Sequence, residues 1–216
     1  MKKVLVSLIV LAALFISGCS DTGVLRINNW SSQLAYYIMS GEENWLDGGY
    51  YVEYEWDLST SIFGDEEKKV NVEIGGDYIF TEVISKKVKP GKTAKINIDT
   101  NAGEILIWND SGSFYILEVY LSPSEDTDWG EDDLIGDIGP GGWVSWYVTP
   151  GYWDIYVIDD YGDEFYSFDN YIGIEETLTF YYDGFKSGGD PIEMKIANAK
   201  KYTQQIEDKI QQNENN

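Results

Sequence analysis

Histidine is absent from the 216-residue chain, and cysteine occurs once, as Cys19. Without histidine there is no Ser-His-Asp triad and no Cys-His catalytic pair, and a conventional zinc site lacks its ligands. A single cysteine also excludes a disulfide within the chain. Basic residues are scarce as well, because 15 Lys and Arg stand against 38 Asp and Glu, for a net charge of −23. Such a chain lacks the basic surface with which proteins meet nucleic-acid phosphates.

Phosphate-binding loops are missing too. No Gly-x-x-x-x-Gly-Lys element occurs, and no Gly-x-Gly-x-x-Gly opens a predicted helix, so the sequence gives no support for nucleotide binding. What the chain does have is 43% hydrophobic and 15% aromatic residues, which is too rich for a disordered acidic polypeptide. We therefore predict a folded protein without nucleotide or nucleic-acid partners and with no resident cofactor, calcium apart.

The N-terminus has the pattern of an export signal. Lys2 and Lys3 form a basic start, and Val4–Ile16 is an apolar run of 13 residues. This run is shorter than the roughly 20 residues of a membrane-spanning helix and fits the hydrophobic region of a signal peptide. An ordinary signal peptide with a chance cysteine is the alternative. The place of the one cysteine, directly after the run, favours a lipid-attachment signal.

The ending Ile16-Ser17-Gly18-Cys19 resembles the lipobox of bacterial lipoproteins. The resemblance implies that residues 1–18 are removed, that Cys19 carries a thioether-linked diacylglycerol, and that the new N-terminus is acylated. Two or three acyl chains anchor a protein stably to a membrane. In this family Ser20, in place of an aspartate, favours the outer membrane, or the plasma membrane where a cell has only one. The predicted location is the cell envelope.

Two acidic segments follow and read as copies of one module. Residues 20–100 carry 14 acidic and 8 basic residues, whereas residues 101–185 carry 19 acidic residues and no basic one. Residues 25–29 align with residues 105–109, and residues 93–99 align with residues 177–183. The offset between aligned segments drifts only between 80 and 85 residues. A nearly constant offset of this kind indicates a duplication.

Both copies have the pattern of β-strands. In the first, Val70, Val72 and Ile74 alternate with polar residues, and glycine- and proline-containing turns recur throughout both copies. The predicted fold is all-β, with two tandem immunoglobulin-like or prealbumin-like antiparallel β-sandwich modules at residues 19–100 and 101–185. We expect six or seven strands in each module. One larger sandwich is the alternative.

Residues 186–216 differ, with five acidic and five basic residues. They predict a linker, a short helix over residues 191–211 that starts at Pro191, and a disordered tail. With fewer than three heptads, docking on a sandwich or fraying is favoured over dimerisation. The predicted apolar seam of the helix consists of Ile192, Ile196, Ala199, Thr203, Ile206 and Ile210.

The second copy also resembles a repeat of secreted and lipid-anchored bacterial proteins, over about residues 103–183. The shared motifs are residues 119–124, Trp129-Gly130, residues 134–136, Pro140-Gly141, residues 150–155 and residues 159–162. The resemblance implies no activity. The first copy lacks the Ser-Pro-Ser and Trp-Gly elements.

The densest set of acidic residues is the predicted metal site. Asp126, Asp128, Asp132 and Asp137 resemble a calcium loop, since Asp137 is the twelfth residue counted from Asp126. The glycine lies at place five instead of six, and the alternative is a solvated acidic turn. Calcium is therefore the one candidate cofactor.

Aromatic residues form a second candidate site. Alternation places Tyr152 and Tyr156 on the face opposite the predicted core, and Trp143 and Tyr147 could belong to a neighbouring strand. Exposed aromatic rings beside carboxylates bind sugars, because the ring faces stack on C–H surfaces and the acids accept hydroxyl hydrogens. The alternative is that these rings pack between the modules or as cross-strand pairs.

These observations favour a non-enzymatic, lipid-anchored envelope protein with a structural or interaction role. A protein or a glycan is its expected partner, besides the membrane that holds the anchor. The alternative is a calcium-dependent or glycan-binding surface module. A hydrolase using paired carboxylates is a third hypothesis, disfavoured because no long pocket-forming loops are apparent. No catalytic residue is predicted.

Overall fold

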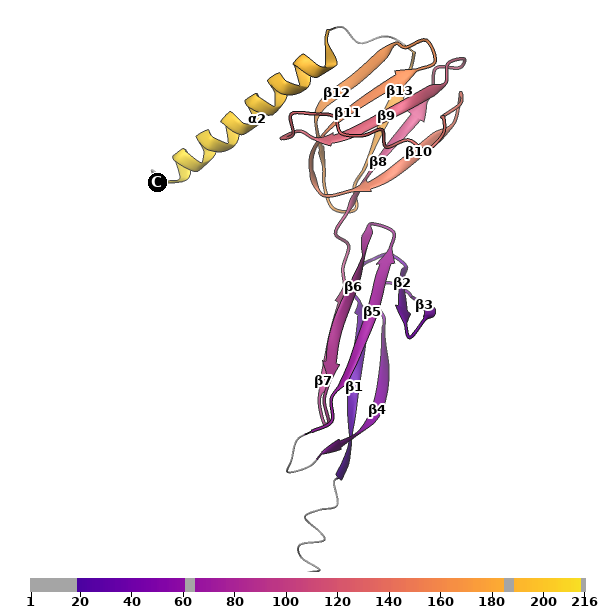
Figure 1. Cartoon of the computed structure of the whole chain (residues 1–216), viewed down its shortest axis with the longest axis vertical. Coiled ribbons are helices and arrows are strands. Elements are labelled where there is room, and N and C mark those ends of the chain that lie inside the picture. The colour runs from indigo at the N-terminus through magenta and orange to yellow at the C-terminus, as the bar shows by residue number, and fades with distance from the viewer. Residues whose placement is uncertain (1–18, 61–64, 185–188, 215–216) are drawn as a thin grey trace, which may run out of the picture. The chain divides into compact units, whose positions relative to one another are not determined.

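The computed structural model describes residues 19–60, 65–184 and 189–214. The chain divides between Thr100 and Asn101 into two compact units, called unit 1 and unit 2 below. Each unit contains two sheets (Figure 1). The core of each unit is dominated by branched aliphatic side chains. Among the described residues one helix lies near the C-terminus. The predicted all-β class of two tandem sandwiches followed by a helix is confirmed.

Unit 1 is built from β1 (Cys19–Asn29), β2 (Ala35–Met39), β3 (Glu42–Leu46), β4 (Tyr51–Thr60), β5 (Lys68–Gly76), β6 (Ile79–Val88) and β7 (Thr93–Ile98). One sheet has the order β4-β1-β7 and the other β3-β2-β5-β6. Neighbouring strands are antiparallel, except that the first strand, β1, pairs in parallel with the last, β7. Val70, Val72 and Ile74 of β5 are buried, as the alternation predicted.

Unit 2 is built from β8 (Gly103–Asn109), β9 (Ile116–Pro123), β10 (Trp143–Val148), β11 (Gly151–Asp159), β12 (Glu164–Ile172) and β13 (Thr177–Tyr182). Its sheets have the orders β10-β8-β13 and β12-β11-β9. Here too the first strand, β8, pairs in parallel with the last, β13. A single bridge between Ile116 and Ile138 takes the place of the β2–β3 pairing.

The register of the strands agrees with the alignment of the two copies. In unit 1 Ile27 of β1 lies opposite Ile96 of β7, and in unit 2 Ile107 of β8 lies opposite Phe180 of β13. Both pairs occupy aligned positions of the sequence. Because a slip of one residue would turn every side chain to the other face, a shared register means that the two copies present equivalent faces to their cores.

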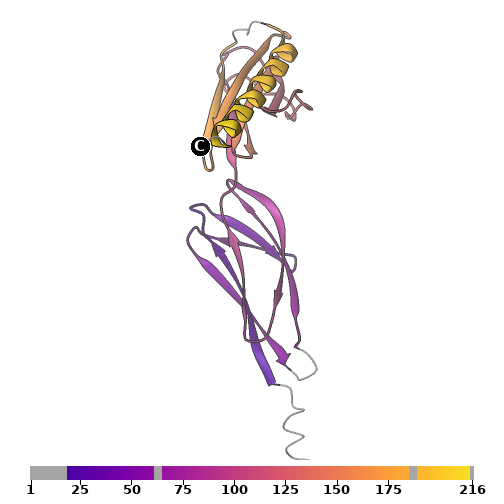
Figure 2. The same ribbon diagram turned by 90° about the vertical axis from the view of Figure 1, so that its left-hand side faces the viewer.

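The helix α2 (Pro191–Glu214) belongs to unit 2. Asp190 caps it, because its Oδ1 accepts hydrogen bonds from the backbone N–H groups of Ile192 at 2.9 Å and Glu193 at 3.1 Å. Pro191 takes the first helical position, where its fixed backbone angle is favourable. The helix starts beside the β12-β11-β9 sheet and runs outward past its edge (Figures 1 and 2).

The buried side of α2 differs from the predicted seam. Lys195 and Ala199 are buried, whereas Ile192 is 62% exposed and Ile206 is 40% exposed. The predicted seam is correct at Ala199 and wrong at Ile192 and Ile206, because the ion pair of Lys195 turns a neighbouring face of the helix toward the sheet. The side chain of Ile210, also in the predicted seam, lies outside the described residues. Within the described ranges no helix is both long enough and apolar enough to cross a membrane.

Candidate functional site

Asp154 of β11 is the centre of a buried polar network, although it lies in a strand of aromatic and aliphatic residues. The pairing of β11 with β12 shifts register at this point, between Trp153 and Ile155. On β12 the shift leaves Asp169 with a positive φ of 57°, and its N–H donates to Asp154 Oδ1 at 2.9 Å. The bulge thus aims a backbone donor at a carboxylate that is fully buried.

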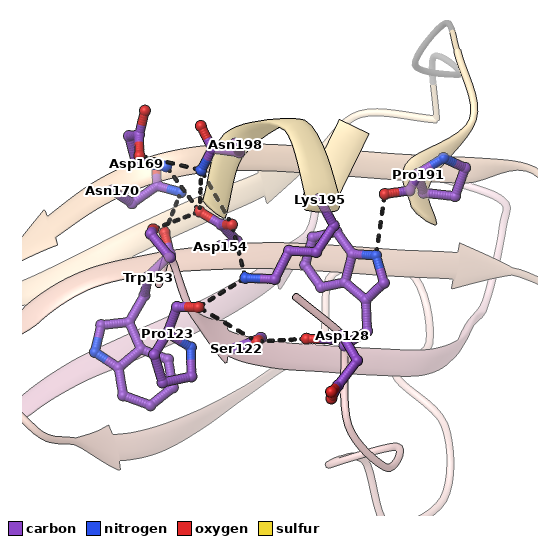
Figure 3. A network of polar contacts seen from close by, with 12 residues as sticks. Ser122, Pro123, Asp128, Trp153, Asp154, Asp169, Asn170, Pro191, Lys195 and Asn198 are labelled. Atoms are coloured by element: carbon purple, nitrogen blue, oxygen red, sulfur yellow. Dashed lines mark hydrogen bonds and ion pairs between the residues drawn. The ribbon is translucent and has the colours of Figure 1, made fainter. Parts of the chain in front are cut away.

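Lys195 of α2 supplies the opposite charge. Its Nζ lies 2.8 Å from Asp154 Oδ2 and donates a second hydrogen bond to the carbonyl of Pro123 at 2.7 Å (Figure 3). Neither side chain of the ion pair is exposed. The ammonium group also lies 5.2 Å from the ring centre of Trp129, in a cation–π contact. Unit 2 has no basic residue before residue 186, so the helix brings the charge that Asp154 requires.

The remaining capacity of Asp154 is filled as well. Ser124 Oγ donates to Oδ1 at 2.5 Å, and Asn198 of α2 donates to both carboxylate oxygens at 3.3 and 3.4 Å. In the described parts of the chain no buried side-chain polar atom lacks a hydrogen bond. Ser124, Asp154 and Lys195 are all fully buried. The network therefore joins α2 to the sheet through buried side chains.

Trp129 joins the start of α2 to the same sheet. Its Nε1 donates to the carbonyl of Pro191 at 3.2 Å, and its ring packs against Tyr156 with centroids 5.1 Å apart. A pocket of about 550 Å³ lies beside it, lined by Tyr156, Glu164 and the residues that open the helix. Tyr156 donates to Glu164 at 3.0 Å; burial, and then this hydrogen bond, raise the pKa of Tyr156. The pocket is thus walled by aromatic rings and carboxylates.

The four predicted calcium ligands are spread along the loop between β9 and β10. Asp132 Oδ1 accepts the N–H groups of Val119 at 2.9 Å and Leu134 at 3.0 Å, and Asp128 Oδ1 accepts that of Gly130 at 3.1 Å. The carboxylates of Asp128 and Asp132 therefore accept backbone hydrogen bonds. The other two predicted ligands, Asp126 and Asp137, are exposed.

Nowhere in residues 19–60, 65–184 and 189–214 do three or more acidic or cysteine side chains form a group suited to a metal ion. One further acid in this loop, Asp133, is perturbed. Burial raises its pKa, although the N–H of Leu121, which donates to its Oδ2 at 2.8 Å, acts in the opposite direction. The calcium site stays a prediction from the sequence.

The four predicted aromatic ligand residues lie on two different sheets. Trp143 and Tyr147 are on the outer face of β10 and are 55% and 42% exposed. Tyr152, on β11, packs against Tyr202 of α2, with ring centroids 5.7 Å apart. Tyr156 is buried beneath Trp129 and the start of α2. The structure therefore keeps two of the four, Trp143 and Tyr147, on one open face.

Two further aromatic residues share that face with Trp143. In the β10-β8-β13 sheet Trp108 lies opposite Trp143 on one side and Tyr181 on the other. Trp108 is 36% exposed and Tyr181 is 64% exposed. We call Trp143, Trp108 and Tyr181 the aromatic row. It crosses all three strands of the sheet at right angles to their direction.

Sequence reasoning missed both the ion pair and the aromatic row. Lys195 and Ala199, four residues apart on one side of α2, were a signal for the buried face, as was a single acid between the aromatic residues of β11. Trp108 and Tyr181 come together through the parallel pairing of the first and last strands of the unit. Both residues follow the strand alternation, so the sequence predicts that their side chains face outward. It does not predict that the two residues are neighbours.

No protein-family model and no curated protein sequence matches the chain. Among solved structures it is similar to the Bacillus anthracis TIE protein, with 14% identity and a TM-score of 0.26, over 74% of this chain and 34% of that one. The chain thus spans about a third of the length of that protein.

Two further similar structures match over most of their own length. One is a DUF3823 family protein from Parabacteroides merdae, with 10% identity, a TM-score of 0.23, and coverage of 73% of this chain and 100% of the other. The second is GBS52, the minor pilin of Streptococcus agalactiae, with 8% identity, a TM-score of 0.26, and coverage of 77% and 97%. The fold assignment itself rests on the strand pairing described above.

Proposed function

We propose that this chain is a non-enzymatic, lipid-anchored protein of the bacterial cell envelope, attached through Cys19 and serving as an interaction module. The observation that carries the proposal is the place of Cys19 in the fold. It is the first residue of β1 and pairs with Thr60 at the end of β4. An acyl chain on this residue would put one particular end of unit 1 at the membrane surface.

That end of unit 1 also carries six lysines. Lys68 and Lys69 open β5, opposite the end of β6, and Gly91 of the following turn donates to the carbonyl of Thr22 in β1. The described segments at this end, residues 19–23, 57–60, 65–70 and 85–93, hold six lysines and five acidic residues. The rest of residues 19–100 holds two basic and nine acidic residues.

This charge distribution supports an orientation toward a bilayer. Lysines close to a membrane surface are attracted by anionic lipids, at about 1 kcal/mol per basic residue. Part of this charge is used internally, because Lys87 and Lys89 form ion pairs with Glu67 at 2.9 and 2.7 Å. Four of the six lysines at this end, those at positions 68, 69, 86 and 92, are outside these two ion pairs. Acyl chains and basic residues together are the two signals of stable anchoring.

An interaction role without catalysis fits unit 2. Its buried network is closed, and its 19 acidic residues between residues 101 and 185, with no base, disfavour anionic partners. Complementary charge steers encounter between proteins, so a cationic protein or a neutral ligand fits this unit. In a cell with two membranes, Ser20 after the anchor favours the outer one, by the resemblance of residues 16–19 to a lipobox.

The test is acylation of the full-length chain produced in a bacterium supplied with an alkyne analogue of palmitate. We expect the label on the wild-type protein and on a Ser20→Ala control, and none on Cys19→Ser. The first two proteins should sediment with membranes, whereas Cys19→Ser should not. An unlabelled wild-type chain, or membrane association that survives Cys19→Ser, would refute the anchor.

A further inference from the structure

We propose that the aromatic row of unit 2, formed by Trp143, Trp108 and Tyr181, is a binding platform for a neutral, extended polysaccharide chain. The inference rests on the proposed interaction role and gives it a ligand class. The three residues occupy neighbouring register positions on β10, β8 and β13, and all three side chains are exposed. Large apolar side chains gathered on an open sheet face mark a site of interaction.

The surroundings of the row supply polar groups. On the same outer face the next positions are Ser145, Leu106 and Thr179, and the following ones are Tyr147, Glu104 and Thr177. Thr177 Oγ1 donates to Glu104 Oε2 at 2.8 Å, which holds the carboxylate beside the platform. Ring faces flanked by hydroxyls and one carboxylate match the two surfaces of a sugar, its C–H face and its hydroxyl rim.

The geometry of the row fits a chain more than a single sugar. Neighbouring strands lie about 4.8 Å apart, so the outer two residues of the row are separated by roughly 10 Å. This is the span of a disaccharide in an extended β-1,4-linked chain. A row across three neighbouring strands offers its rings one after another to an extended, ribbon-like polymer.

Charge selects a neutral ligand. Between residues 101 and 185 unit 2 carries 19 acidic residues and no basic one. This field repels anionic polysaccharides, anionic lipids and a second copy of the unit. Among the three residues of the row and the six outward-facing residues next to it, Glu104 is the one charged residue. A cationic protein would therefore find few carboxylates to pair with there. An uncharged sugar polymer bears no electrostatic penalty at this face.

Unit 1 shows that the scaffold does not require aromatic residues at two of these three positions. The corresponding residues of its β4-β1-β7 sheet are Tyr51, Asn28 and Asn97. Asn28 Nδ2 donates to Asn97 Oδ1 at 2.8 Å, and the guanidinium of Arg26 lies 4.5 Å from the ring centre of Tyr51. In unit 1 the two asparagines therefore contact each other and Arg26 contacts the ring of Tyr51, whereas unit 2 places exposed rings at all three positions.

The experiment is a pull-down of residues 19–216, carrying Cys19→Ser, with microcrystalline cellulose and with chitin, followed by calorimetry with cellohexaose and chitohexaose. Alginate and a polylysine resin are the anionic and cationic controls. We expect binding to at least one of the two neutral polymers. Trp143→Ala and Tyr181→Thr should each weaken it by about tenfold, in line with the loss of one stacked ring. Trp108→Ala should abolish it.

The matched controls are Tyr51→Ala at the corresponding position of unit 1 and Tyr50→Ala, an exposed tyrosine outside the row. Both should bind like the parent chain. Circular dichroism melts identify any variant that fails to fold, and Tyr181→Thr, which keeps a strand-favouring residue at a sheet edge, remains informative if Trp108→Ala does not fold.

Two results would overturn the inference: a parent chain that binds neither neutral polymer, or binding that Trp143→Ala and Tyr181→Thr leave unchanged. Binding to alginate or polylysine that depends on the row would overturn it too. A chain that is acylated at Cys19 but does not bind the polysaccharides would refute this inference alone. It would not contradict the proposed lipid-anchored function.

Discussion

Asn29 of unit 1 and Asn109 of unit 2 make the same set of hydrogen bonds in the two sandwiches. Asn29 Nδ2 donates to the carbonyls of Gln33 and Leu46, both at 2.8 Å. Asn109 Nδ2 donates in the same way to Phe114 at 2.7 Å and to Ile138 at 2.8 Å. Both asparagines are fully buried at the end of the first strand of their unit.

The acceptor side of the two amides is also shared. Asn29 Oδ1 accepts from the N–H and Oγ of Ser31, at 3.1 and 2.6 Å, and Asn109 Oδ1 accepts from the same groups of Ser111, at 3.1 and 2.7 Å. Each side chain therefore ties the turn after the first strand to a segment that is distant in the sequence. These asparagines satisfy backbone groups that the two sandwiches could not otherwise pair.

We predict that Asn109→Ala destabilises unit 2, and Asn29→Ala unit 1, by about 3 kcal/mol, because two buried carbonyls lose their donor and a serine loses its acceptor. Urea unfolding followed by tryptophan fluorescence would measure the loss. The matched control is Asn44→Ala on β3, whose side chain is half-buried and makes one long bond of 3.3 Å to the carbonyl of Glu42, with an expected effect below about 0.5 kcal/mol. Equal effects at Asn44 and Asn109 would contradict this role.

A second prediction concerns the attachment of α2. Lys195→Met leaves the carboxylate of Asp154 buried without its counter-charge, which typically costs about 3–5 kcal/mol. We expect the helix to detach from the sheet before unit 2 unfolds, because Lys195 and Asn198 bind Asp154, and Trp129 binds the carbonyl of Pro191. Hydrogen–deuterium exchange should therefore rise along residues 191–203 while the strands of unit 2 stay protected.

Lys201→Met is the control for that experiment. Lys201 also pairs with an aspartate, Asp169, at 3.1 Å, but its side chain is 61% exposed. An exposed ion pair contributes at most about 1 kcal/mol. The double variant Asp154→Leu with Lys195→Met should recover part of the stability, because it removes both buried charges at once. Identical exchange in Lys195→Met and Lys201→Met would show that the buried pair does not hold the helix.

The repeat in the sequence predicted much of the fold. The alignment of residues 25–29 with residues 105–109 placed Asn29 and Asn109 at corresponding positions, and the alternation in β5 identified its core face. These features are local, because strand direction and side-chain face repeat every two residues. The same reasoning found Trp143 and Tyr147, which do lie on one open face.

Pairing between distant strands could not be predicted in this way. Nothing local in β8 or β13 indicates that Trp108 and Tyr181 become neighbours, since that depends on the parallel register of the first and last strands. Tyr156 follows the alternation and faces away from the core, yet it is buried because a loop and α2 cover that face. The buried side of α2 also carries a charged residue, Lys195, and a search for apolar residues at helical spacing does not identify such a face.

A third prediction follows from the lysine-bearing end of unit 1. Replacing Lys68, Lys69, Lys86 and Lys92 by glutamine should weaken retention of the acylated protein on vesicles containing phosphatidylserine, by about 1 kcal/mol per residue at low salt. Retention on purely phosphatidylcholine vesicles should not change. Added salt should remove the difference between variant and parent, because it screens the lipid charge.

The control for the vesicles is the pair Lys200→Gln and Lys201→Gln on α2, which changes the net charge without touching unit 1. It should behave like the parent chain. Flotation on density gradients measures both variants under the same conditions. A loss of binding that is equal for anionic and neutral vesicles would mean that the lysines of unit 1 do not face the lipid.

A fourth prediction is a loss of stability at alkaline pH. Burial is the largest factor that raises the pKa of Tyr37, Tyr156 and Tyr182 above the ordinary value of 10.0, and a hydrogen bond adds to it in each case. A phenol whose pKa is higher in the folded protein holds its proton more tightly there. Its contribution to stability is therefore complete below pH 10 and is lost as the pH rises from 10 toward the folded pKa.

The free energy of unfolding should thus fall above pH 10, and these phenols should ionise only together with unfolding. Tyrosinate absorbance measures ionisation of the phenols, and far-ultraviolet circular dichroism measures unfolding. We expect the ionisation of these buried phenols and the unfolding to occur over the same pH range. Tyr182→Phe should reduce the pH dependence of stability above pH 10, because it removes one of the phenols concerned, whereas Tyr50→Phe, at an exposed position, should leave it unchanged. An unchanged pH dependence in Tyr182→Phe would contradict the assignment.

Calcium and magnesium should stabilise unit 2 equally, because carboxylates of its acidic loop accept backbone hydrogen bonds. Asp128 and Asp132 accept N–H groups of Gly130 and Leu134 in the loop, and Asp132 also accepts that of Val119 in β9, while Asp126 and Asp137 are exposed. The density of like charge still makes the unit sensitive to screening, which at ordinary ionic strength acts beyond about 8–10 Å. We expect the same rise in Tm with either ion, and a comparable rise with sodium chloride at matched ionic strength.

Asp126→Asn combined with Asp137→Asn should raise Tm at low salt by relieving repulsion. A saturable rise specific to calcium, lost in that double variant, would instead establish a calcium site in the loop.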